Sequence, residues 1–97
     1  MYLVRDVFQT KPGKAKDLVK LFKEVNKFMP KEGIGRTRFM TDVVSNYWTV
    51  VLEIEIESLS FWENMSGFTS KPEVKEIMKD YMTLVEGGHR EIFKIEE

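Results

Sequence analysis

The sequence predicts a single α+β domain, residues 1–97, in which two helices cover one face of a four-stranded antiparallel sheet. Three observations predict it. Side chains alternate from Tyr47 to Glu57, as they do along a strand, with one set made of Trp48, Val50, Leu52, Ile54 and Ile56. Two other segments repeat apolar residues at helical spacing. The predicted elements follow the order βαββαβ, which is the ferredoxin-like arrangement.

The first half of the chain opens with a strand over Tyr2–Gln9, which is rich in Val, Leu, Phe and Tyr. From Lys14 the spacing becomes helical, and we expect this helix to stop near Pro30. The apolar positions of the helix are Ala15, Leu18, Val19, Phe22, Val25 and Met29. Two glycines follow, and Ile34–Asp42 is then the second strand.

A hairpin joins the second strand to the third, with its turn near Val44-Ser45. A turn at that point pairs Phe39 with Val50 and places Arg36 across from Glu53. This register puts apolar residues on one face and charged residues on the other, whereas a one-residue slip would invert every side chain.

The second half of the chain reads as helix and then strand. Ser58–Phe68 is a short helical segment, and Ser70–Glu73 is a capping box with proline in the first turn. We expect the second main helix to run from there to Gly87-Gly88, and the last strand to span His89–Glu96.

With both helices on one side, the second face of the sheet has no cover within the chain. Its predicted members are Leu3, Val7, Met40, Thr49 and Val51, with Ile92 left open, interleaved with Arg5, Arg36, Arg38 and Glu53. An apolar surface of this kind marks an interaction site. We therefore expect a second copy of the chain to cover it.

Composition excludes several classes of function. With 15 basic and 16 acidic residues the net charge is -1, which gives no electrostatic case for nucleic acid. The chain has no cysteine, so it forms neither disulfides nor thiolate metal sites. No apolar run approaches the roughly 20 residues that cross a bilayer, and no signal peptide is visible. We expect a cytoplasmic protein without membrane contact.

Three segments resemble the NIPSNAP and antibiotic-biosynthesis-monooxygenase-like families: VRDVFQTKPGKAKDLVKLF, SLSFWENMSGFTSKPEVKEIMKDY and GGHREIFKIEE. The resemblance spans nearly the whole chain. It implies a ferredoxin-like protomer that pairs sheet against sheet in a homodimeric α+β barrel. It also implies a pocket for a small molecule, either between sheet and helices or inside the barrel.

The heme-degrading branch of these families carries an Asn on the first strand, a Trp in the second helical region and a His further along. Here Val7 and Met78 stand near the first and last of these positions, and Trp62 alone matches. Without an imidazole no axial ligand is offered to iron. The sequence therefore argues against heme degradation and predicts no cofactor.

The candidate ligand-pocket residues are the charged and aromatic side chains that the core does not obviously require. They are Arg38, Tyr47, Glu53, Trp62, Tyr81 and His89. Trp62 could equally serve as a core packing residue, and Arg38 and Glu53 could equally form salt bridges at a dimer interface. His89 is the single histidine, and without a second histidine or a cysteine we predict no metal site.

Three functions remain open. The first is a homodimeric barrel that binds a small apolar or aromatic molecule. The second is a cofactor-independent monooxygenase or isomerase acting on phenolic or quinol-type substrates. An RNA-binding module is the third, because such modules share βαββαβ, but the basic-glycine-aromatic pattern of those modules is absent from the third strand.

Overall fold

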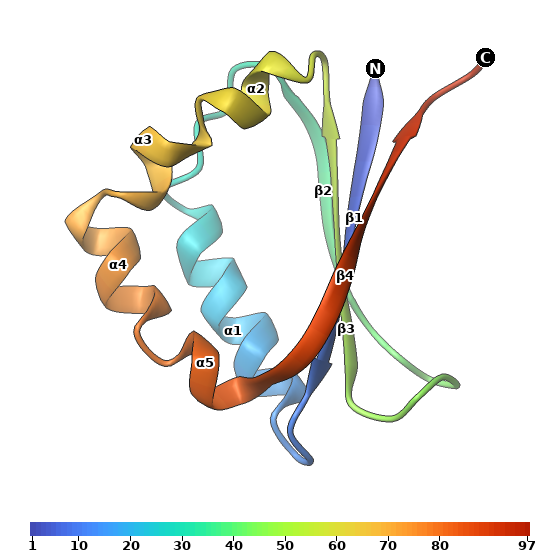
Figure 1. The fold of residues 1–97 in the computed structure, drawn as a ribbon, viewed down its shortest axis with the longest axis vertical. Helices are drawn as coiled ribbons and strands as arrows, with labels where there is room; N and C mark the ends of the chain where they lie inside the picture. The colour runs from blue at the N-terminus through green and yellow to red at the C-terminus, as the bar shows by residue number, and fades with distance from the viewer.

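The computed structural model describes residues 1–97, except for the side chains of Trp62 and Ser66. Helices occupy one side of a single twisted sheet and leave the other side bare (Figure 1). The elements are β1 Tyr2–Thr10, α1 Ala15–Asn26, β2 Ile34–Thr41, β3 Thr49–Ile56, α2 Ser60–Glu63, α3 Met65–Thr69, α4 Pro72–Met78, α5 Tyr81–Leu84 and β4 Val85–Lys94. The four strands lie in the order β2-β3-β1-β4 and every neighbouring pair is antiparallel. The predicted ferredoxin-like α+β fold is confirmed.

The core lies between the sheet and α1, as the helical spacing predicted. Leu18, Phe22 and Val25 are buried along one side of α1, where they meet Val50 and the helical residues Phe68 and Val74. A second cluster, Val4, Ile54 and Ile56, fills the other end of the same sheet face.

The β2–β3 register differs from the predicted one by two residues. Phe39 lies opposite Leu52 rather than Val50, and Arg38 rather than Arg36 lies opposite Glu53. The pairing is irregular between Ile34 and Thr37, where the register shifts by one residue. A shift of two residues keeps each side chain on its face, so the predicted division into faces still holds.

The segment before β3 is not strand, contrary to the prediction. Tyr47 and Trp48 have positive φ angles of 48° and 55°, and β3 begins at Thr49. Their carbonyl oxygens accept hydrogen bonds from β1: Gln9 Nε2 donates to Tyr47, and Thr10 donates to Trp48 through both its amide, at 2.9 Å, and its hydroxyl, at 3.1 Å. These long-range bonds hold a conformation that L-residues rarely adopt.

The predicted end of the second main helix is also wrong. Helix α4 stops at Met78, α5 adds one turn, and β4 already begins at Val85, so that Gly87 and Gly88 are strand residues. A Cβ at Gly88 would lie 2.4 Å from the main-chain oxygen of Val7. This glycine therefore permits a close approach of β4 to β1.

The predicted capping box is not formed either. The N-cap of α4 is Lys71, without a side-chain hydrogen bond, and the Ser70 hydroxyl donates instead to the carbonyl of Gly67 at 3.1 Å.

Candidate functional site

The uncovered side of the sheet, which we call the open face, carries the alternate residues of all four strands. Strand alternation and pairing assign to it Leu3, Arg5, Val7, Gln9, Arg38, Met40, Thr49, Val51, Glu53, Glu55, Gly87, His89, Glu91 and Phe93. The sequence leaves the face of Ile92 open. Ile92 pairs with Val4 and therefore lies on the helix side, whereas Phe93 lies on the open face. The Arg5 guanidinium lies 5.5 Å from the centre of the Phe93 ring, a cation–π contact.

Glu53 lies at the centre of the open face and is only 4% exposed, although no helix covers it. Two arginines enclose it: Arg5 Nε donates to Oε2 at 2.7 Å, and Arg38 Nη2 donates to Oε1. Burial raises the pKa of the Glu53 carboxyl, but the hydrogen bonds from Arg5 and then Arg38 lower it by more, and the result lies below its ordinary value. The carboxylate therefore stays ionised at neutral pH.

The network continues to the edge of the sheet. Arg5 Nη1 lies 3.5 Å from Glu91 Oε1, and His89 Nε2 lies 3.3 Å from Glu91 Oε2. The hydrogen bond that Arg5 donates to Glu53 raises the pKa of the Arg5 guanidinium, and the Glu53 and Glu91 charges add to the rise. Arg38, Glu53, Arg5 and Glu91 thus form one connected group, which we call the ionic row.

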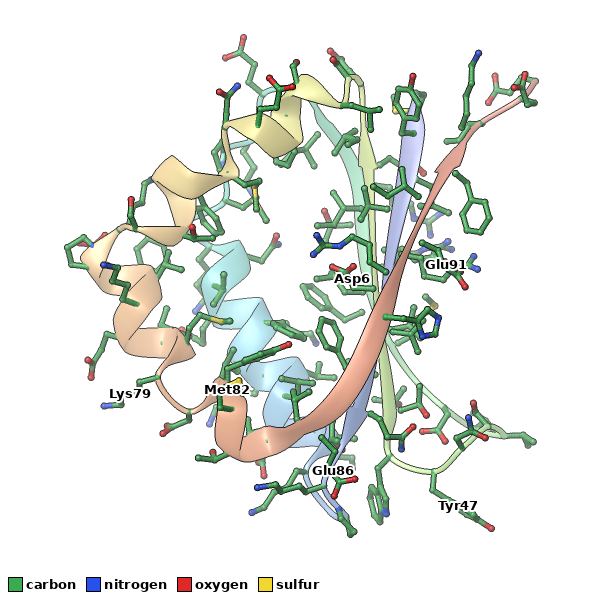
Figure 2. All side chains as sticks on the ribbon, in the orientation of Figure 1. Asp6, Tyr47, Lys79, Met82, Glu86 and Glu91 are labelled. Atoms are coloured by element: carbon green, nitrogen blue, oxygen red, sulfur yellow. The ribbon has the colours of Figure 1, made fainter. Side chains whose placement is uncertain are left out.

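A second polar site lies on the helix side, in a cleft of about 390 Å³ between β4 and α5. The cleft is lined by Asp6, Phe8, Tyr81, Met82, Val85, Glu86, Gly87, Gly88, His89 and Arg90. Figure 2 shows Met82 and Glu86 near its α5 end and Asp6 on the sheet. We call it the β4–α5 cleft.

The floor of this cleft is a charge pair. Asp6 and Arg90 are opposite each other in the β1–β4 pairing. The Arg90 guanidinium donates two hydrogen bonds, of 2.5 and 3.1 Å, to the Asp6 carboxylate. Asp6 is 6% exposed, so its charge needs this bidentate partner.

The wall of the cleft is aromatic. The rings of Phe8 and Tyr81 meet edge to face with centroids 6.1 Å apart, and Phe22 packs behind both. Burial raises the pKa of the Tyr81 phenol, the charge of Asp6 raises it further, and Arg90 offsets part of the rise. The hydroxyl is therefore a hydrogen-bond donor at neutral pH.

The structure distributes the six predicted site residues over several places. Arg38 and Glu53 are bonded to each other on the open face, where the His89 ring also lies, while Tyr81 belongs to the β4–α5 cleft. Tyr47 is 80% exposed in the β2–β3 loop. The sequence predicts that Trp62 lines a pocket, but its side chain lies outside the part of the chain that the structure describes.

The prediction missed Asp6 as a site residue. A signal for it was present: Asp6 interrupts the apolar series Val4, Phe8 on the helix-facing side of β1, and a buried carboxylate requires a cation. Arg90 is that cation, but it lies 84 residues along the chain.

Among the described residues, no group of three or more His, Asp or Glu side chains is arranged to hold a metal ion. Among the described helices, none combines the length and the apolar character needed to cross a membrane.

Solved structures share this fold over the whole chain. Protein Atu4242 from Agrobacterium tumefaciens matches with a TM-score of 0.83 at 15% identity, covering 100% of this chain and 95% of that one. An uncharacterised NIPSNAP domain protein from Burkholderia xenovorans matches with a TM-score of 0.80 at 12% identity, covering 99% of this chain and 95% of that one. A putative antibiotic biosynthesis monooxygenase from Chloroflexus aurantiacus matches with a TM-score of 0.72 at 15% identity, covering 99% of this chain and 94% of that one.

No family model and no curated protein matches the sequence. At these identities the structural matches establish the fold, and they confirm at that level the resemblance to NIPSNAP and antibiotic-biosynthesis-monooxygenase-like proteins.

Proposed function

We propose that this protein is a homodimer, formed through the open face, that binds a small aromatic molecule in the β4–α5 cleft of each protomer. The observation that carries the ligand proposal is the combination in one cleft of an aromatic wall and a fixed charge pair. Small-molecule sites in proteins are mostly apolar with a few polar groups that orient the ligand.

The chemistry of the cleft suggests the kind of ligand. A planar ring can lie against Phe8 and Tyr81, and the Tyr81 hydroxyl has no hydrogen-bond partner among the described residues, so it is available to an acceptor on the ligand. A hydroxyl on the ligand can donate to Asp6. Because Arg90 already neutralises Asp6, a neutral phenol suits the cleft better than an aromatic acid or amine.

The open face supports the homodimer. It surrounds the ionic row with Leu3, Val7, Met40, Val51 and Phe93, an uncovered apolar surface of the kind that marks an interface. Sedimentation at micromolar concentration tests this step, and a monomer would contradict it. The cytoplasmic location stays a prediction.

Ligand binding is tested by calorimetry and ligand-observed NMR with a panel of phenol, catechol and 1-naphthol. Tyr81→Leu removes both the hydroxyl and the ring edge, and we expect at least tenfold weaker binding of any member that binds. Tyr47→Leu is the matched control, because Tyr47 lies outside the cleft. Equal losses in the two variants, or no binding of any member to the wild type, would contradict the proposed site.

A second candidate function is oxidation of a quinol by molecular oxygen without a cofactor. One possible proton acceptor, the Asp6 carboxylate, lines the same cleft and could remove the proton from a bound phenol. Oxygen uptake with hydroquinones tests it, and a rate no higher than that of protein-free buffer would exclude it. Slower uptake in Asp6→Asn would assign the acceptor.

A further inference from the structure

A third groove lies between the β2–β3 loop and the first turn of α1, at the end of the sheet where β1 leads into α1 (Figure 1). Thr41, which lines it, pairs with the buried core residue Val50, so the groove lies on the helix side of the sheet. Its volume is about 520 Å³, and none of its described lining residues belongs to the β4–α5 cleft or to the open face. The lining side chains that concern binding are Lys16, Asp42, Val43, Tyr47 and Trp48. We call it the β2–α1 groove.

Two opposite charges line this groove without being paired to each other. The Lys16 ammonium makes no ion pair or hydrogen bond with the described residues, whereas the neighbouring Lys14 lies 3.9 Å from Asp17. Asp42 Oδ1 accepts a hydrogen bond from the Thr49 amide at 2.9 Å, which fixes the carboxylate, and Asp42 Oδ2 has no partner in the described part of the chain. The groove therefore offers one cation and one carboxylate oxygen to a ligand.

The wall of the groove is apolar and takes no part in the core. Val43, Tyr47 and Trp48 are 98%, 80% and 44% exposed. Consecutive side chains of a strand point to opposite faces, but Tyr47 and Trp48 both have positive φ angles and both line the groove. Hydrogen bonds from Gln9 and Thr10 fix their backbone, so the two rings are positioned before any ligand arrives.

We propose that the β2–α1 groove binds a free amino acid with an aromatic side chain. The α-carboxylate pairs with the Lys16 ammonium, the α-ammonium donates to Asp42 Oδ2, and the ring lies against Trp48. The volume is within the range of small-molecule sites. This site depends neither on the proposed homodimer nor on ligand binding in the β4–α5 cleft.

The two charges also discriminate against other small aromatic molecules. An aromatic acid leaves Asp42 without a partner and is repelled by it, and an aromatic amine meets the same repulsion at Lys16. A neutral phenol satisfies neither charge. An internal segment of a peptide lacks both the free ammonium and the free carboxylate. The zwitterion of an amino acid carries the two groups on one carbon and complements both.

Amide chemical shifts of the isotope-labelled protein, titrated with L-tryptophan to millimolar concentration, test the site. We expect shifts at residues 13–16 and 41–48. N-acetyl-L-tryptophan lacks the ammonium, L-tryptophan amide lacks the carboxylate and L-alanine lacks the ring, and each should bind at least about fivefold more weakly. These comparisons use the wild-type chain, so no folding defect enters them.

Variants assign the two charges. Asp42→Asn keeps an acceptor for the Thr49 amide but removes the charge, and Lys16→Gln removes the cation, so each should weaken L-tryptophan binding about fivefold. Lys20→Gln, on the exposed side of α1 and outside the groove, is the matched control and should bind as the wild type does. Absence of shifts, shifts confined to residues 81–90, equal binding of the acetylated and amidated compounds, or equal affinities in the three variants would overturn the inference. Shifts confined to residues 81–90 would at the same time leave the β4–α5 cleft as a binding site, which separates the two proposals.

Discussion

Replacing Glu53 with glutamine tests the physical basis of the open face. The substitution keeps the size of the side chain and one acceptor oxygen but removes the negative charge that holds Arg5 and Arg38. Removing one member of a fully buried ion pair costs about 3–5 kcal/mol. Here the arginine side chains are 38% and 45% exposed, so water stabilises the charges left behind.

Solvent screening reduces the expected loss in the free energy of unfolding to about 1–2 kcal/mol, which is close to the summed stabilisation from two exposed ion pairs. Urea denaturation at pH 7 measures it, at one fixed protomer concentration because association contributes to stability. Glu55→Gln is the matched control: it lies two residues away on the same strand and face, and no salt bridge of Glu55 is found among the described side chains. We expect its effect to stay within about 0.5 kcal/mol.

The pH dependence gives an independent check. Because the pKa of Glu53 is lowered from 4.5 in the folded chain, the unfolded chain binds a proton more readily in the window just below that value. The stabilisation from Glu53 is therefore fully present above pH 4.5 and is lost as the pH falls through the lowered pKa. The difference between wild type and Glu53→Gln should shrink below pH 4.5, and a constant difference, or equal losses in the Gln variants at positions 53 and 55, would refute the reasoning.

Three further predictions concern other parts of the fold. Gly88→Ala should lower stability by about 1–3 kcal/mol in thermal unfolding, because the new methyl group meets the neighbouring strand, whereas Gly87→Ala, with nothing within 4 Å, should be neutral or slightly stabilising. Tyr47→Gly should leave stability unchanged or raise it by up to about 1 kcal/mol in urea, because φ at this exposed position is 48°; a loss would mean that the ring packs on something. Asp6→Asn should lower stability by about 1–2 kcal/mol, and the loss should be smaller when Arg90→Gln is already present; additive losses would deny the pair.

The layers of the fold follow from the sequence because burial leaves a periodic trace. The helical spacing from Ala15 to Val25 describes a helix with one buried side, and the structure confirms it. The alternation from Thr49 to Ile56 correctly predicts a strand, although Thr49 and Glu53 on its open face are buried as well. The same signal cannot distinguish registers that differ by two residues, since both put the same side chains on the same faces. This is why the predicted faces hold while the Phe39–Val50 pairing does not.

The loop before β3 shows what a local pattern cannot contain. Tyr47 and Trp48 continue the alternation of the strand, yet their conformation is decided by Gln9 and Thr10, which donate hydrogen bonds from 38 residues away. The β4–α5 cleft is a similar case. Asp6 marks one half of a charge pair in the sequence, but only the β1–β4 pairing identifies Arg90 as the other half.

Charge also determines how β1 and β4 pair. Along β1 the consecutive residues Arg5 and Asp6 point to opposite faces, and along β4 Arg90 and Glu91 do the same with the same order of sign, which the antiparallel pairing sets in opposition. In the observed register each face therefore receives one complementary pair. A slip of one residue in one direction would set Arg5 against Arg90, and a slip in the other would set Asp6 against Glu91. Exposed ion pairs contribute at most about 1 kcal/mol each to stability. Their larger effect is to exclude the two slipped registers. Because a slip of one residue turns the side chains of a strand to the other face, the same pairs keep the ionic row on the open face and away from the core.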